Sequence, residues 1–233
     1  MPKITKYYGI RTSVEFLDVN VSRDNRMYID PRAVRLERGP RPYVNQANKC
    51  TSTFFDTVSE CAVSQVKSDQ RRGLDLLQHF SEPKETRLGM SLEGIDGHGG
   101  AGDVGNAIWR ALTTNLKAFV RVGLLKHIED IPVFVKGVDK DITSDLTTRI
   151  IFKPLAKFTQ EMVSKYPEFT SGRHQVDSHD FQVWNPRQLR WETESLELPI
   201  AESRPLLLVP KHWARPRLLM SSTRYYKTSV LDF

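Results

Sequence analysis

Apolar residues recur at intervals of three and four through the middle of the chain, which is the spacing of one face of an α-helix. Over residues 51–80 the pattern predicts two helices, with Gly73 as the break between them. Residues 104–120 predict a further amphipathic helix. Residues 146–162 predict another, in which Pro154 is expected to introduce a kink. This pattern requires a helical layer in the middle of the fold.

The two ends of the chain show a different pattern, in which short apolar segments alternate with turn residues. Residues 22–25 are expected to form a turn and residues 38–42 a loop. A helix-rich middle between strand-rich ends predicts an α+β fold. The segments expected to form short strands are residues 14–19, 27–31, 181–184, 196–199 and 206–211.

The length of 233 residues is enough for one domain that buries a core without disulfides or metals. Hydrophobic residues make up 39% of the chain and charged residues 27%, as in ordinary globular proteins. We expect a single domain over residues 1–233. A division into a helix-rich part, 1–166, and a strand-rich part, 181–233, also fits, with residues 167–180 as a polar connector.

Cysteine usage and hydropathy indicate a cytoplasmic protein. Cys50 and Cys61 are the only cysteines, and no secretory signal precedes them. Neither they nor the histidines show the spacing of a zinc site. The longest apolar run, residues 205–210, is far shorter than the roughly 20 residues that span a bilayer. We therefore expect no membrane segment.

Basic residues outnumber acidic residues by 34 to 28, which gives a formal net charge of +6. Arginines gather at two places along the chain, and basic stripes of this kind give salt-dependent affinity for nucleic acid. Nucleic-acid contact is therefore predicted, with a solvated face or an acidic protein partner as the alternative. The arginines concerned are Arg32, Arg35, Arg38, Arg41, Arg204, Arg215, Arg217 and Arg224.

Three tryptophans, Trp184, Trp191 and Trp213, lie close to the second group of arginines. Aromatic side chains beside basic ones are used to stack and neutralise single-stranded nucleic acid. Burial in the core is the alternative explanation.

A glycine-rich segment at residues 94–105 precedes the predicted helix at 104–120. It contains the spacing GxGxxG at Gly97, Gly99 and Gly102, with Gly100 between them, and such a loop at a helix N-terminus can hold a phosphate. The preceding strand is weak, and no acidic residue follows at the distance typical of dinucleotide-binding folds. A loop in which glycines permit positive φ, and which closes over a ligand, is the simpler prediction.

Asp139, Asp141 and Asp145 form the densest acidic cluster. Asp141 and Asp145 are four residues apart, so on a helix they share a face and could hold Mg²⁺ or Mn²⁺ between them. The alternative is a helix start in which Asp141 or Ser144 caps the free N–H groups.

Glu197 and Lys211 add a third set of candidate catalytic residues, each in a predicted C-terminal strand. Metal-dependent nucleases of the PD-(D/E)xK type place an acid on one strand and an acid-x-lysine on its neighbour. The position two before Lys211 is Val209, so the second carboxylate would have to come from Asp145, Glu93 or Asp18. The alternative is a strand-terminal lysine that faces solvent or phosphate.

Several short motifs also occur in a recognisable order along the chain. They are residues 16–18, 28–31, 97–102, 141–146, 158–160, 198–199 and 208–211. Their order resembles a family of uncharacterised bacterial proteins associated with mobile elements and anti-phage defence islands. The resemblance implies a role in defence against foreign DNA and carries no catalytic assignment with it.

Three functional hypotheses result. The first is a component of a bacterial defence complex that contacts nucleic acid and a protein partner, such as an ATPase or nuclease subunit. The second is a divalent-metal nuclease that uses Asp139, Asp141 and Asp145, with Glu197 and Lys211. The third is a nucleotide-binding enzyme that uses the glycine-rich loop. Convergence of the acidic side chains in a basic cleft would favour the second.

Overall fold

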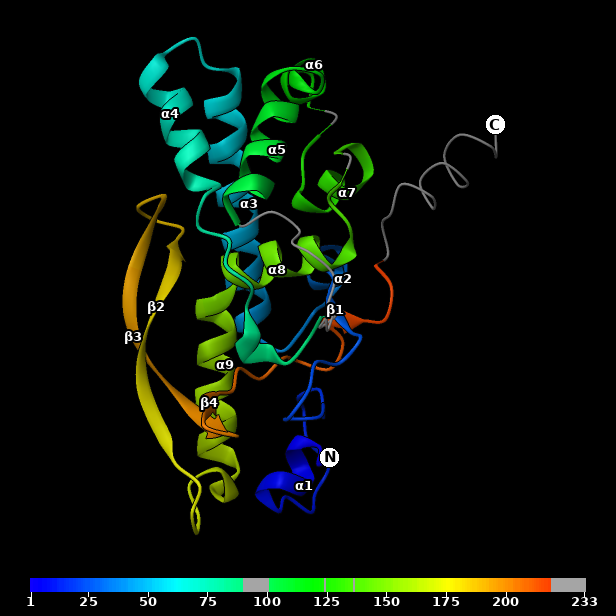
Figure 1. The fold of residues 1–233 in the computed structure, drawn as a ribbon, viewed down its shortest axis with the longest axis vertical. Coiled ribbons are helices and arrows are strands. Elements are labelled where there is room, and N and C mark those ends of the chain that lie inside the picture. The colour runs from blue at the N-terminus through cyan, green and yellow to red at the C-terminus, as the bar shows by residue number, and fades with distance from the viewer. Residues whose placement is uncertain (90–100, 124, 136, 219–233) are drawn as a thin grey trace, which may run out of the picture.

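The computed structural model describes residues 1–89, 101–123, 125–135 and 137–218. Within them the chain has an α+β fold, which confirms the predicted class. A layer of helices forms the bulk of the molecule, and an antiparallel hairpin lies along one side of it (Figure 1). The described helices are α1 (Ile4–Tyr8), α2 (Pro31–Leu36), α3 (Tyr43–Val63), α4 (Lys67–Leu76), α5 (Ala101–Thr113), α6 (Lys117–Arg121), α7 (Ile131–Phe134), α8 (Lys140–Ile150) and α9 (Phe152–Lys165).

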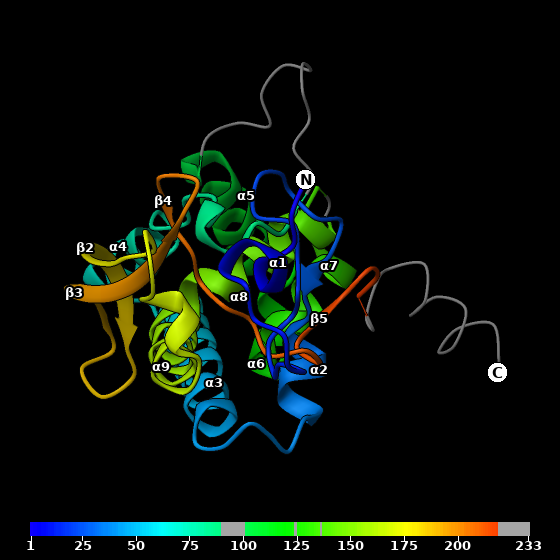
Figure 2. The ribbon, with the colours of Figure 1, turned by 90° about the horizontal axis from the view of Figure 1, so that it is seen from below.

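Helix α3 is the centre of the helical layer. It packs against α2, α4, α5, α6, α8 and α9, and Figure 2 shows α9, α3 and α2 side by side along one edge of the molecule. Its buried face includes Phe54, Phe55 and Val58, which recur at helical spacing. Because α3 is central, segments that are far apart in the sequence lie against its two sides.

The two helices predicted over residues 51–80 are present, but the predicted break is wrong. The break lies between α3 and α4, where Ser64 ends α3 with extended backbone. Gly73 is inside α4. A Cβ at Gly73 would lie 2.5 Å from the Trp109 ring and 2.6 Å from the Cβ of Cys61, so the glycine permits close helix packing.

The predicted kink at Pro154 is a complete break between α8 and α9, at Ile151. A helical proline cannot bond the carbonyl four residues earlier, here that of Ile150, and its ring clashes with that group. The helix predicted over 104–120 is likewise divided into α5 and α6. The Thr113 and Thr114 hydroxyls there bond carbonyls of the last turn of α5.

The strands in the described part of the chain form two small antiparallel sheets. Strand β1 (Tyr28–Ile29) pairs with β5 (Ala214–Arg215), and β2 (Val176–Asn185) pairs with β3 (Arg190–Ala201), which in turn pairs with β4 (Arg204–Pro205). The polar connector predicted over 167–180 is wrong in its second half, because β2 begins there. Alternation of polar and apolar residues in β2 is visible only beyond Phe181.

Two predicted strands are extended segments without a strand partner along their length. Residues 206–209 are buried, but their N–H groups bond three different elements: the carbonyls of Pro199 and Glu85 and the Thr159 hydroxyl. Residues 14–19 meet this run at the bridge between Phe16 and Pro210, where the N–H of Leu17 donates to the carbonyl of Val209. The apolar run is therefore held in the core by several elements and not by one continuous strand partner.

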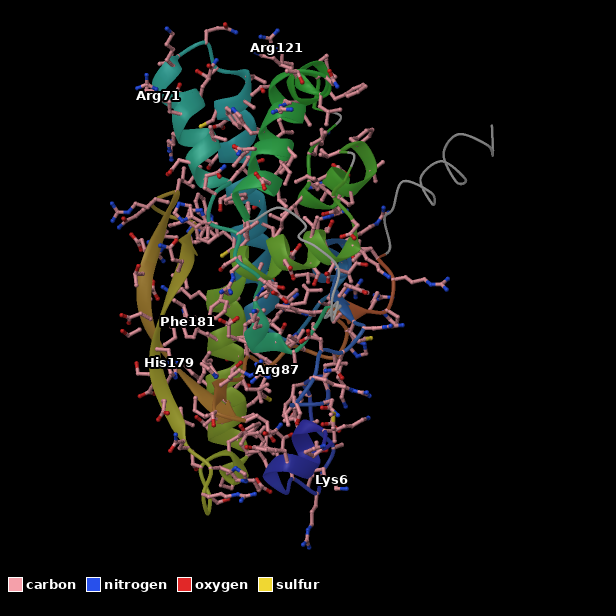
Figure 3. The ribbon with its side chains drawn as sticks, in the orientation of Figure 1. Lys6, Arg71, Arg87, Arg121, His179 and Phe181 are labelled. Atoms are coloured by element: carbon pink, nitrogen blue, oxygen red, sulfur yellow. The ribbon has the colours of Figure 1, made fainter. Side chains whose placement is uncertain are left out.

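Arg87 joins the loops around this run (Figure 3). Its side chain is 1% exposed, and its guanidinium donates to the carbonyls of Val21, Lys84, Ala201, Arg204 and Pro205. Burial lowers the pKa of this guanidinium to about 10, so it remains charged at neutral pH. Arg87 is a structural cation.

One cluster of buried apolar side chains includes residues from both the helix-rich and the strand-rich parts, from Ile4 to Ala214. Cys50 and Cys61 are free and buried. Every helix in the described ranges is too short or too polar to cross a bilayer. The division into one or two domains stays a prediction.

Candidate functional site

The acidic residues at the start of α8 include the residue that caps this helix. The Oδ1 atom of Asp139 accepts hydrogen bonds from the N–H groups of Asp141 and Ile142, at 2.9 and 3.0 Å. The cap is therefore Asp139, whereas Asp141 and Ser144 were the expected capping residues. Ser144 instead accepts from the N–H of Ile29 and ties α8 to β1.

Asp145 lies one turn inside α8 and is half-buried. Burial raises the pKa of its carboxyl to about 8, and the neighbouring charges of Asp141 and Glu82 add to this effect. Arg149 acts in the opposite direction, but its guanidinium donates to the carbonyls of Ser81 and Glu82. The carboxyl of Asp145 therefore carries a proton for much of the time at neutral pH.

The remaining candidates of the nuclease hypothesis lie on other elements. Glu197 is exposed on β3, opposite Ser178 of β2, and Lys211 is exposed where its N–H bonds the carbonyl of Glu15. Among the residues that the structure describes, no three His, Cys, Asp or Glu side chains are arranged to hold a metal. Glu93 lies outside the described residues. The nuclease site stays a prediction.

The glycine-rich loop is described only where it enters α5. Gly97, Gly99 and Gly100 lie outside the described residues, and Gly102 is in the first turn of α5. A Cβ at Gly105, one turn further, would lie 2.0 Å from the carbonyl oxygen of Leu77. The glycine at 105 therefore permits α5 to pack against the end of α4.

The tertiary structure brings parts of the two arginine groups together. Strand pairing sets Tyr28 opposite Arg215, and the Trp213 indole donates to the carbonyl of Gly39. This places residues 213–217 beside the segment that carries the first group. Arg204 is separate, on β4 beside Arg87. The exposed or half-buried members are Arg32, Arg35, Arg38, Arg41, Arg204, Arg215 and Arg217, and Arg224 lies outside the described residues.

The tryptophans belong to the core. Trp184 and Trp213 are fully buried, and the Trp191 indole donates to the carbonyl of Leu76. Trp184 also donates to the Thr53 hydroxyl at 3.0 Å, which holds β2 against α3. The prediction of base stacking is therefore wrong for Trp184 and Trp213, whose rings are buried in the core, whereas Trp191 is half-buried against the core.

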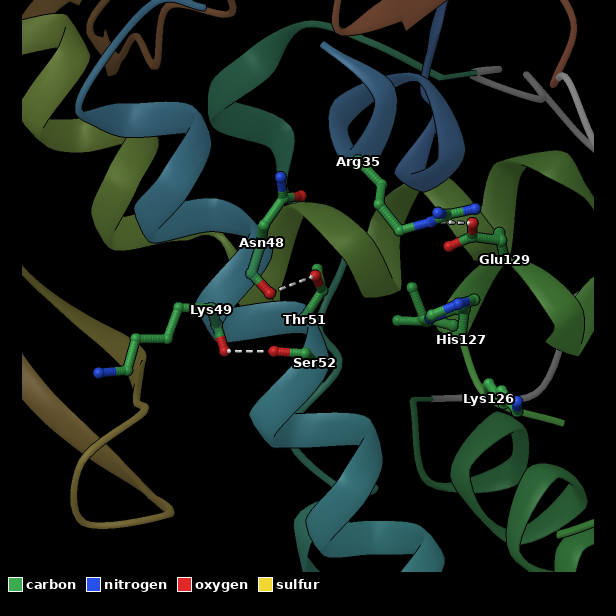
Figure 4. Close-up of a pocket in the computed structure, with 9 residues that line it drawn as sticks. Arg35, Asn48, Lys49, Thr51, Ser52, Lys126, His127 and Glu129 are labelled. Carbon is green, nitrogen blue, oxygen red and sulfur yellow. Dashed lines mark hydrogen bonds and ion pairs between the residues drawn. The ribbon is translucent and has the colours of Figure 1, made fainter. Parts of the chain in front are cut away.

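A first cavity, of about 360 Å³, lies between α3 and the segment before α7. Its cationic lining residues are Arg35, Lys49 and Lys126, with His127 beside them. The Arg35 Nε lies 2.7 Å from the Glu129 carboxylate, which is almost buried (Figure 4). Figure 4 also shows the Lys49 side chain extending from α3 away from Glu129. We call this the Arg35 cavity.

A second cavity, of about 430 Å³, opens on the other flank of α3 and is more strongly basic. The residues that define it here are Lys49, Cys50, Lys153, Lys157, Trp184 and Arg187, and no carboxylate is among its described lining residues. They come from α3, α9 and the turn between β2 and β3. We call this the basic cavity.

Cys50 lines the basic cavity together with its lysines. The charges of Lys153, Lys49 and Lys157 all act to lower the pKa of the Cys50 thiol. Burial nevertheless raises the pKa of that thiol to about 12, so it stays neutral. The cavity is therefore suited to binding an anion and unsuited to thiolate chemistry.

Most of these cations are not used by the fold. Lys153 pairs with Glu194. Lys49, Lys157 and Arg187 are exposed and form no ion pair within the described ranges. Sequence analysis missed them because they are scattered along the chain. The spacing of Lys153 and Lys157, one helical turn apart, was the only local signal.

The chain belongs to a protein family described as a domain of unknown function, DUF8370, which matches residues 9–221. No curated protein and no solved structure matches the chain.

Proposed function

We propose that this chain is a nucleic-acid-binding protein that contacts phosphates along the flank formed by α2, α3 and α9. The observation that carries the proposal is that Lys49 lines both cavities. Through it, Arg35 and Lys126 on one side are continuous with Lys153, Lys157 and Arg187 on the other. Arg38 and Arg41, exposed between α2 and α3, extend the same face. We name these residues the basic face.

The physical basis is electrostatic. Each phosphate neutralised by a lysine or arginine releases a condensed counterion, which makes affinity high at low salt. Exposed cations without an ion-pair partner do not have to break an internal contact before they bind. Lys49, Lys157 and Arg187 are of this kind, so the basic face is the part of the described structure best prepared for a polyanion.

A binding role accounts for the described residues better than autonomous catalysis does. The described lining of the basic cavity contains no carboxylate, and the densest acidic cluster has one member engaged as a cap and another with a raised pKa. In a defence complex of the kind the resemblance implies, this chain would supply nucleic-acid contact and a protein partner would supply the reaction.

The test is binding of labelled single- and double-stranded DNA and RNA over a range of salt concentrations. We expect the double variant Lys49→Glu, Lys157→Glu to lose about tenfold in affinity or more per reversed charge at low salt, and its salt dependence to be less steep by about two units of slope.

The matched control is Lys6→Glu, Arg71→Glu, which makes the same change in net charge. Both residues are exposed, and Figure 3 places them at opposite ends of the molecule. Equal losses in the two double variants would overturn a localised interface. Incubation with Mg²⁺ or Mn²⁺ in parallel would reveal cleavage, and cleavage abolished by Asp141→Ala, Asp145→Ala would establish the nuclease hypothesis instead.

A further inference from the structure

The basic cavity differs from the rest of the basic face in shape and in charge. It is concave, with about 430 Å³ of space, and cationic residues enter it from three separate elements. Lys49 comes from α3, Lys153 and Lys157 from α9, and Arg187 from the β2–β3 turn. A phosphate inside it would meet several cations at once, whereas a phosphate on an open surface meets one or two.

The turn that carries Arg187 is held in place by its neighbours. The Oδ1 atom of Asn185 accepts from the N–H groups of Arg187 and Gln188, at 2.9 and 3.1 Å. At the far end of the turn, Arg72 donates to the carbonyl of Leu189. The position of Arg187 at the cavity is therefore built into the hairpin.

The helical side of the cavity is fixed in the same way. The bond between the Trp184 indole and Thr53 fastens β2 to α3, and the ion pair of Lys153 with Glu194 fastens α9 to β3. These contacts use one of the four cations and leave Lys49, Lys157 and Arg187 for a ligand. A site whose walls are set before the ligand arrives loses little freedom on binding.

Three available cations exceed what one internal phosphodiester requires. A phosphodiester carries a single negative charge, whereas a phosphomonoester carries about −1.5 to −2 at pH 7 and offers three strong acceptor oxygens. Charge-assisted hydrogen bonds from lysine and arginine to such oxygens are the strong kind. The neutral Cys50 thiol adds no competing negative charge.

We infer that the basic cavity binds a phosphomonoester dianion, supplied by the phosphorylated end of a nucleic-acid strand that lies on the basic face. The identity of the strand rests on the proposed function. The same chemistry could be supplied by a free nucleoside monophosphate, and the two sources are separated by experiment.

The experiment compares one oligonucleotide in three forms, with a 5′ phosphate, with a 3′ phosphate and with hydroxyls at both ends. We expect a phosphorylated form to bind at least about tenfold more tightly than the hydroxyl form, which is the ratio that one charge-assisted contact provides. Lys157→Gln, Arg187→Gln should abolish this preference. The variant Lys126→Gln, which removes one charge in the Arg35 cavity, should weaken all forms equally and keep the preference.

The outcomes separate the inference from the proposed function. Equal binding of all forms, salt-dependent and weakened by the variants, would overturn the inference and leave the proposed function standing. Saturable binding of a nucleoside monophosphate, lost in Lys157→Gln, Arg187→Gln, together with no binding of any oligonucleotide, would support the phosphomonoester site and overturn the proposed function. Absence of binding by every oligonucleotide, by the monophosphate and by inorganic phosphate would overturn both.

Discussion

The start of α8 and the basic cavity are the two densest groups of like charge considered above, and they are built in opposite ways. Asp139, Asp141 and Asp145 are neighbours in sequence, and the fold uses two of them: Asp139 caps the helix, and the half-buried Asp145 has a raised pKa. The cations of the basic cavity come from distant segments, and three of them are left without an ion pair in the described structure. In this chain, the acidic residues that cluster in the sequence serve the fold. The basic residues that the fold brings together from distant segments form the candidate site.

The largest expected effect concerns Asp145 and pH. The pKa of its carboxyl rises from 3.8 to about 8 on folding, so between these pH values the unfolded chain is ionised while the folded chain keeps its proton. Stability should therefore fall as pH rises from about 4 to about 8, by on the order of 5 kcal/mol for the full shift. Asp145→Asn should lack this slope and be more stable than the wild type at pH 8.

Urea unfolding at a series of pH values measures this difference. A wild-type curve parallel to that of Asp145→Asn would show that the carboxyl is not engaged as described. Stabilisation of the wild type at pH 8 by Mg²⁺ or Mn²⁺, absent in Asp145→Asn, would mean that the acidic cluster is a ligand site as well.

The next effect concerns Arg149, the cation beside the acidic cluster. Arg149 is 7% exposed, donates to the carbonyls of Ser81 and Glu82, and pairs with Glu85. Arg149→Met should cost about 3 kcal/mol, because a buried side chain loses its hydrogen bonds and its ion pair together. Lys157→Met, the matched change in the basic cavity, should stay within about 0.5 kcal/mol. Equal losses would show that the cavity cations are structural too.

A smaller effect is expected at the cap. Asp139→Ala should lower the free energy of unfolding by about 1 kcal/mol, because the N–H groups of Asp141 and Ile142 lose their acceptor. Asp139→Asn keeps an accepting oxygen and should retain most of the stability. Chemical denaturation at pH 7 distinguishes the two. No difference between them and the wild type would mean that the cap does not hold the start of α8.

The smallest expected effect concerns two lysines of the basic cavity. Lys49→Gln and Lys157→Gln should leave the melting temperature nearly unchanged and weaken polyanion binding, because neither lysine holds the fold together. A stabilising effect of inorganic phosphate on the wild type that is reduced in both variants would place an anion in the basic cavity. Unaltered stabilisation would place that anion elsewhere.

Several elements could be predicted because their cause is local. The helical spacing over 51–80 predicted α3 and α4, and Pro154 predicted the interruption found at Ile151. The break assigned to Gly73 was wrong because the sequence does not distinguish a glycine that ends a helix from one that leaves room for a neighbouring aromatic ring. The strand predicted over 206–211 was wrong because an apolar run predicts that a segment is buried but does not predict that another strand pairs with it.

The candidate site divides in the same way. The arginines of the first group could be recognised from their density in the sequence, and Arg35 does line a cavity. Lys49, Lys157 and Arg187 stand singly in sequence, and nothing local distinguishes them from solvated surface charges. Their common position depends on α3 packing against α9 and on Trp184 fastening the hairpin to α3.

By itself, the sequence determined the α+β class, the amphipathic helices and the excess of basic charge, since these follow from hydrophobic period, helix-breaking residues and composition. Only the tertiary structure decided which charged side chains are buried or ion-paired and which remain available to a ligand. The reason is that burial and ion pairing depend on neighbours brought together across the chain, as Glu194 meets Lys153 while Lys49, Lys157 and Arg187 keep no ion pair in the described structure.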